Sequence, residues 1–270
     1  MAFKIGFSVE TEKKLENEVI PGASKRTTPK KSVVRVFFPQ KNTTLSYYNE
    51  LFDLRAGDLV YVDGKLEGLQ GRVIEISYNF KIKLSDYRRV IALVDTDVSG
   101  DFYVAGSHCV SFDRKTLPYE KALLWFKAPG KDDDEIVSEN DDFSFCLNDL
   151  SGMKIKSEVA ERGHEYYIDN RVRYLCIDGH KGHAVVLGSE AYEVDFDYHD
   201  GEIYNLTCDC FCTYRCKHEF AAMLQLRETL EYIEKNYSSK YKETGYFAAI
   251  NKADLFINAI DNKETGHFSL

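Results

Sequence analysis

The sequence is poor in proline, has little sulfur outside one cluster, and has no long apolar run. Five prolines in 270 residues, with 44% hydrophobic and 29% charged residues, are typical of a globular chain long enough for one large or two ordinary domains. Residues 1–19 are charged throughout and contain no stretch that could act as a signal peptide or membrane span. We therefore expect a cytoplasmic protein without a membrane partner.

Sequence motifs of common enzyme classes are also missing. The chain contains no GxxxxGK[ST], GxGxxG or GxSxG pattern, which excludes the usual phosphate-binding loops and the nucleophile elbow of hydrolases. Most of the seven histidines show no ligand spacing to carboxylates or thiols. The prediction is that the protein is not an enzyme.

Charge of one sign dominates a single segment. The net charge is -9, and seven acids and one base in Lys131–Asp142 account for six of those nine negative charges. Such acidic runs are usually solvated linkers. Without this one, the rest of the chain is close to neutral. The acidic balance therefore does not by itself exclude a nucleic-acid partner.

The first half predicts an arm and a small β-rich domain. Residues 1–32 are expected to be a partly disordered arm, and residues 33–112 contain about five short β-rich runs separated by glycine-containing turns, as in a small β-barrel. The stretch Leu54–Ile76 resembles the strand-turn-strand of KOW and SH3-like barrels. Residues 113–142 are expected to form a helix, from Pro118 to Pro129, and the acidic linker.

A strand rich in basic residues is expected near the end of this barrel. In SYNFKIKLSDYRRV the lysines alternate with apolar residues, so that one face could follow a phosphate backbone. A solvated strand face is the other interpretation. The candidate nucleic-acid contacts, which include two bases of the later cysteine-rich segment, are Lys81, Lys83, Arg88, Arg89, Arg215 and Lys217.

Residues 143–270 predict a second domain built on antiparallel strands. Three runs between residues 165 and 198 alternate apolar and polar residues, and apolar residues then recur every three or four positions from Phe220 to Tyr237, as in a helix with one buried stripe. A shorter helix is expected near Lys252–Ile260. The fold class is therefore α+β: strand-rich, with a small N-terminal barrel and an antiparallel-sheet domain ending in helices.

Four of the seven cysteines lie within Thr207–Phe220, in the stretch TCDCFCTYRCKHEF. Cys208 and Cys210 are two apart at a strand end, so their side chains share a face, while Cys216 and His218 lie at the start of a helix. A five-residue spacer can bring the two pairs together around one tetrahedral zinc ion. We expect one structural Zn²⁺ bound by these four residues.

Other uses of the cluster are possible. Cys212 is an alternative ligand, although pairing Cys210 with Cys212 leaves only three residues before Cys216. A disulfide between neighbouring cysteines is disfavoured in a reducing compartment. A nucleophilic cysteine would need an orienting group and an oxyanion site that no motif supplies.

The order C-x-C, five residues, C-x-H, followed by the helix that begins FAAML, resembles the SWIM-type zinc finger. The segments ERGHEYYIDNRV and HAVVLGSEAYEV resemble the β-segments that precede that motif in bacterial SWIM proteins. Family members often have proline after the second cysteine, where Phe211 stands here. The resemblance implies a module that binds proteins or DNA, often beside helicase-type ATPases of the SWI2/SNF2 class.

Two binding functions follow as hypotheses. The segment Cys208–Tyr237 contains four basic and five acidic residues, a net charge of -1. This charge is unfavourable for binding phosphates, so it favours a protein partner, such as a SWI2/SNF2-like ATPase, over nucleic acid. An unrecognised enzyme is a third hypothesis. If zinc replaces core that a small module lacks, Cys216→Ser should unfold the chain after about residue 143.

Overall fold

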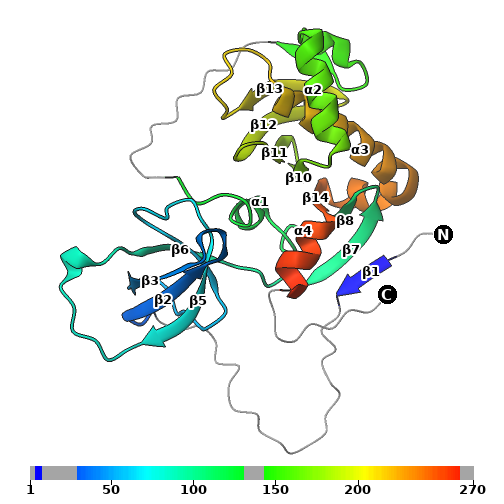
Figure 1. Cartoon of the computed structure of the whole chain (residues 1–270). Coiled ribbons are helices and arrows are strands. Elements are labelled where there is room, and N and C mark those ends of the chain that lie inside the picture. Colours follow the sequence, from blue (N-terminus) through cyan, green and yellow to red (C-terminus); the bar gives the residue numbers. More distant parts are fainter. Residues whose placement is uncertain (1–3, 8–28, 131–142, 262–270) are drawn as a thin grey trace, which may run out of the picture. The chain divides into compact units, whose positions relative to one another are not determined.

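The computed structural model describes residues 4–7, 29–130 and 143–261, which form two compact units (Figure 1). The predicted α+β class is confirmed, since both units are built on antiparallel sheets and the helices follow the strands of the second sheet or connect them. Most of the expected arm, and all of the acidic run Lys131–Asp142, lie outside the described residues.

The N-terminal unit is a five-stranded antiparallel sheet in the order β3-β2-β5-β4-β6. Its apolar core comes from alternating residues such as Val34, Val36 and Phe38 of β2. The strands are β2 (Ser32–Phe38), β3 (Thr43–Asn49), β4 (Leu59–Val62), β5 (Gly71–Ser77) and β6 (Val90–Val94), with short 3₁₀ turns η1 (Pro39–Lys41) and η2 (Leu84–Asp86).

This sheet is not a closed barrel within the described residues. Its two edge strands meet at one isolated bridge, between Tyr48 of β3 and Arg89 just before β6, where the Tyr48 N–H donates to the carbonyl of Arg88 at 2.8 Å. The expected boundary at residue 112 also differs from the structure. The strands at Gly100–Ala105 and His108–Ser111 join the second sheet, because their hydrogen-bonding edges pair with each other and with a strand at the C-terminal end.

The larger unit is a nine-stranded antiparallel sheet in the order β1-β7-β8-β14-β10-β11-β12-β13-β9. The hairpins β10-β11 and β11-β12 form its centre, and β14, far away in sequence, pairs with β10. Its strands are β1 (Lys4–Phe7), β7 (Gly100–Ala105), β8 (His108–Ser111), β9 (Ser144–Cys146), β10 (Val172–Asp178), β11 (Lys181–Leu187), β12 (Ala191–His199), β13 (Glu202–Cys208) and β14 (Tyr246–Asn251).

The long helix α3 (Lys217–Thr244), kinked at Tyr237, packs across this sheet and carries the predicted buried stripe (Figure 1). Leu175 and Ile177 of β10 face it and are fully buried with Met223 and Leu226 of the helix. The helix ends at Gly245, whose left-handed backbone closes the last turn. The predicted C-terminal piece is confirmed as α4 (Lys252–Phe256), continued by a π-turn over Ile257–Asp261.

The helix α2 (Ser157–Ile168) was not expected, because its sequence was interpreted as a β-segment. It packs on α3, and Gly163 makes the close approach possible: a Cβ there would lie 2.9 Å from the Lys217 carbonyl oxygen and from the Phe220 side chain. The expected helix from Pro118 to Pro129 is only the five-residue α1 (Tyr119–Leu123), followed by single turns. A 3₁₀ turn, η3 (Leu150–Met153), precedes α2.

Candidate metal centre

The four predicted ligands come together where β13 ends and α3 begins. Cys208 is the last residue of β13, Cys210 follows in the loop, Cys216 is the N-cap of α3 and His218 lies in its first turn. The Sγ atoms and a ring nitrogen of His218 all lie within 4.8 Å of one another. The Cys208 Sγ is 3.7 Å from the His218 Nδ1. These residues form a Cys₃His group whose geometry suits a single metal ion.

The spacing matches a tetrahedral ion closely. Bond lengths of about 2.3 Å to sulfur and 2.0 Å to nitrogen place neighbouring ligand atoms roughly 3.5 to 3.8 Å apart. The described side chains therefore need to move inward by at most about 1 Å to bind one ion. Cys212 is exposed and is not part of the group that meets this distance.

The backbone of α3 holds Cys216 in place. Its Sγ accepts the N–H of Glu219 at 3.4 Å, while its own N–H donates to the Glu219 carboxylate at 2.6 Å, a reciprocal capping box. Arg215 lies 3.5 Å from the same carboxylate and donates to the carbonyl of Leu206 on β13. This network joins the strand end to the helix start.

Aromatic side chains fix the ring of His218. Tyr192 of β12 stacks on it, with ring centroids 4.2 Å apart and an angle of 15°, and Tyr166 of α2 lies 5.5 Å away. Its Nε2 is buried without a hydrogen-bond partner among the described residues, and a Cβ at Gly188 would lie 3.2 Å from that atom. The ring is therefore held with Nδ1, rather than Nε2, toward the sulfur atoms.

The close spacing and burial of the thiols shift their pKa values in opposite directions. A hydrogen bond from Cys208 lowers the pKa of Cys216, and the same pairing raises the pKa of Cys208, so one proton serves both groups. Burial raises the pKa of Cys210 to about 12, and burial raises the pKa of Glu219 to about 7. Without a cation, thiolates this close repel one another, whereas a bound metal deprotonates its coordinating thiols.

The other predicted contact residues lie in two separate places. Lys81 and Lys83 are exposed, but the predicted basic strand is wrong: β5 ends at Ser77, and a loop with one 3₁₀ turn continues to Arg89. Arg89 forms an ion pair with Glu50, and Arg88 is exposed beside Gly64. The polar turn residues Ser77, Asn79 and Ser85 interrupt the alternation that predicted a strand.

Arg215 and Lys217 belong to the metal centre itself. Lys217 Nζ lies 4.5 Å above the ring of Tyr166, and Arg215 is half-buried against Phe143. The sequence interpretation missed the three neighbouring bases of the α2 region, Lys154, Lys156 and Arg162. The segment KIKSEVAER held that signal, but without the helix its charges could not be placed beside the cysteines.

Comparisons with known proteins give one partial similarity. No protein-family model and no solved structure matches the chain. An uncharacterized protein of Methanocaldococcus jannaschii, MJ1493, is 32% identical over 82 residues, which are 30% of this chain and 34% of that protein. The match thus spans about a third of the relative and shows no activity. Among the helices of the described residues, none has the length and apolar character needed to cross a bilayer.

Proposed function

We propose that this protein is a zinc-binding, SWIM-type interaction module in which the metal is structural and no reaction is catalysed. The observation that carries the proposal is the convergence of Cys208, Cys210, Cys216 and His218 at a strand end and a helix start. Four protein donors fill a tetrahedral site, which leaves no open position for water or substrate.

The donor set supports zinc over other ions. Three thiolates and one imidazole are soft ligands that suit tetrahedral Zn²⁺, whereas Mg²⁺ and Ca²⁺ require oxygen ligands. When bound, zinc would supply a fixed tetrahedral link between β13 and α3. That link orders the loop 209–215, which carries the exposed side chains of Phe211 and Tyr214.

The partner follows from the resemblance and the exposed loop. SWIM modules are associated with helicase-type ATPases of the SWI2/SNF2 class, so a protein of that class, or DNA, is the partner in this proposal. A cytoplasmic location is part of it, because the seven cysteines are free in the structure. The loop 78–89 is an alternative nucleic-acid contact, supported by the exposed bases Lys81, Lys83 and Arg88.

Metal analysis of the purified chain tests the proposal. We expect one zinc per chain, and after exchange a cobalt form with the intense thiolate charge-transfer and tetrahedral d–d bands of a Cys₃His site. Cys208→Ser and His218→Ala should lose the metal, while Cys146→Ser, a thiol outside the cluster, should keep it. A chain purified and reconstituted under reducing conditions that binds no zinc would refute the proposal.

A further inference from the structure

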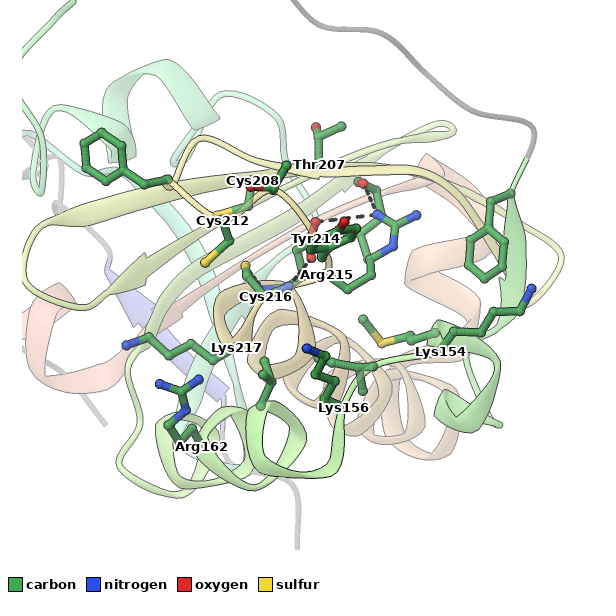
Figure 2. Close-up of a pocket in the computed structure, with 18 of the residues that line it drawn as sticks. Lys154, Lys156, Arg162, Thr207, Cys208, Cys212, Tyr214, Arg215, Cys216 and Lys217 are labelled. Atoms are coloured by element: carbon green, nitrogen blue, oxygen red, sulfur yellow. Dashed lines mark hydrogen bonds and ion pairs between the residues drawn. The ribbon is translucent and has the colours of Figure 1, made fainter.

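A hollow of about 1150 Å³ opens beside the metal centre, between α2 and the loop that precedes α3 (Figure 2). Figure 2 shows Lys154, Lys156 and Arg162 on the α2 side, and Cys212, Tyr214 and Arg215 on the loop side. Cys208 and Cys216 also line the hollow, so the loop forming one wall is the loop that the metal orders. We name this hollow the finger groove.

Positive charge dominates the finger groove. Its lining contains five bases, Lys154, Lys156, Arg162, Arg215 and Lys217, and one acid, Glu219. The Glu219 carboxylate is buried, accepts a hydrogen bond from the Cys216 N–H and forms an ion pair with Arg215. Among the described residues, Lys154, Lys156, Arg162 and Lys217 form no ion pair, so their charges are available to an anionic ligand.

Three aromatic side chains also line the finger groove. Phe211 is fully exposed and Tyr214 is 86% exposed, although both are large side chains that proteins usually cover. A third ring, Phe143, has the cations of Lys154 and Arg215 over it at 4.9 and 5.4 Å. Cationic side chains alternating with exposed rings are the pattern that binds phosphates and stacks unpaired bases.

Three acids further along α3 lie outside the groove lining, which weakens the argument against nucleic acid from the net charge of -1 in Cys208–Tyr237. Glu228, Glu231 and Glu234 line a second hollow with His164 and Tyr167. Glu231 is fourteen residues beyond Lys217, or about 21 Å along the helix axis. Salt screens charges over about 8 Å in physiological conditions, so these acids oppose a ligand in the finger groove only weakly.

We propose that the finger groove binds single-stranded nucleic acid. Its lysine and arginine side chains contact the phosphates, and the rings of Phe211 and Tyr214 stack on nucleobases. This inference rests on the proposed function, because the metal orders the loop that carries both rings. Single strands are favoured over a duplex since only unpaired bases offer a free face to an exposed ring. The ligand is recognised by its backbone and ring faces, so DNA and RNA strands both qualify.

Fluorescence anisotropy of the zinc-loaded full chain tests this proposal. The probes are a labelled 20-mer of thymidine, a 20-mer of uridine and a 20-base-pair DNA duplex, each titrated at several salt concentrations. We expect at least one single strand to bind more tightly than the duplex, with affinity that falls as salt rises. Duplex binding as tight as that of both single strands would overturn the single-strand assignment.

Charge variants locate the site. Lys156→Gln/Arg162→Gln should weaken single-strand binding and lower the slope of log K against log salt by about 1.4, at about 0.7 per phosphate contact. The matched control, Lys235→Gln/Lys242→Gln, removes the same charge from exposed positions at the far part of α3 and should leave affinity and slope unchanged. Equal loss in both double variants would show non-specific attraction and refute the groove.

Ring variants test stacking separately. Phe211→Ala and Tyr214→Ala should each weaken single-strand binding about tenfold while leaving the salt slope in place. Unchanged affinity in both would refute the assignment of these rings. Zinc content is measured on every sample: a chain with one zinc and no strand binding refutes the groove alone, whereas a chain without zinc refutes the proposed module.

Discussion

Removing the metal should release the loop 209–215 while leaving the nine-stranded sheet folded. The sequence alone predicted loss of the whole second domain, on the view that zinc replaces a missing core. The structure has that core: Leu175, Ile177, Met223 and Leu226 are fully buried between β10 and α3, in a cluster that spans the sheet. The four candidate ligands lie at the edge of this cluster, so the influence of a metal bound there is expected to be local.

The magnitudes agree with a local effect. Seven residues separate Cys208 from Cys216, and ordering each backbone costs roughly 1–2 kcal/mol, or about 7–14 kcal/mol for the loop. Structural zinc in finger peptides contributes about 10–16 kcal/mol, which is the same size. Metal binding therefore offsets the ordering of the loop, with little left over to stabilise a sheet that already has its own apolar core.

Cys216→Ser separates metal binding from helix capping. Serine is a good N-cap, so its hydroxyl can replace Sγ as acceptor for the Glu219 N–H, but it is a poor zinc ligand. Cys216→Ala loses both roles and should be less stable than the serine variant by about 1 kcal/mol in the metal-free state. Urea denaturation of the two variants with chelator present measures this difference.

Hydrogen exchange detected by mass spectrometry measures the released region. In chelated protein and in Cys216→Ser, peptides from 209–216 should exchange rapidly, while those from β10 and β14 keep the protection of the zinc-loaded chain. Cys146→Ser with zinc is the control and should resemble the parent throughout. Loss of protection in β10 together with the loop would refute the reasoning, as would a loop that stays protected without metal.

Three further results are expected. Cys212→Ser should keep one zinc per chain, because the exposed Cys212 lies outside the group of close ligand atoms; loss of metal would make it a ligand. Burial lowers the pKa of His108 to about 4, so between about pH 6.5 and pH 4 this histidine binds a proton more readily in the unfolded state than in the folded state. The contribution of His108 alone should lower stability by about 3 kcal/mol over that range, while Glu219 and Asp254, whose pKa values burial raises, contribute with the opposite sign. Urea midpoints across this range should be flatter for His108→Gln, and an equally steep fall would contradict the assignment. Gly163→Ala should destabilise the chain by about 1–3 kcal/mol, although alanine favours helices, because its Cβ would meet Lys217 and Phe220 at 2.9 Å; thermal unfolding measures this, and a stabilised variant would show that α2 can shift freely.

The sequence was sufficient for the features that depend on local spacing. The C-x-C pair at a strand end and the C-x-H pair at a helix start come together because a short loop joins them. The apolar stripe from Phe220 to Tyr237 predicted the helix that carries the second pair. The sequence was insufficient where pairing between strands far apart in the chain decides which sheet a strand joins. The strands at 100–105 and 108–111 alternate in the same way as those before them, and only their pairing with β14 assigns them to the larger sheet. The segment of α2 contains two tyrosines and a glycine, which weaken the helical signal, and its packing on α3 overrides that preference.

The net charge of -9 describes the whole chain, but a ligand responds to charge within a few Debye lengths of its site. Six of those charges lie in Lys131–Asp142, outside the described residues, and Glu228, Glu231 and Glu234 of α3 line a second hollow rather than the finger groove. The groove itself has five bases and one buried acid. The choice between a protein and a nucleic-acid partner therefore depends on how folding separates the basic side chains that line the groove from Glu228, Glu231 and Glu234 further along α3, and this separation favours an anionic strand at the candidate metal centre even in an acidic protein.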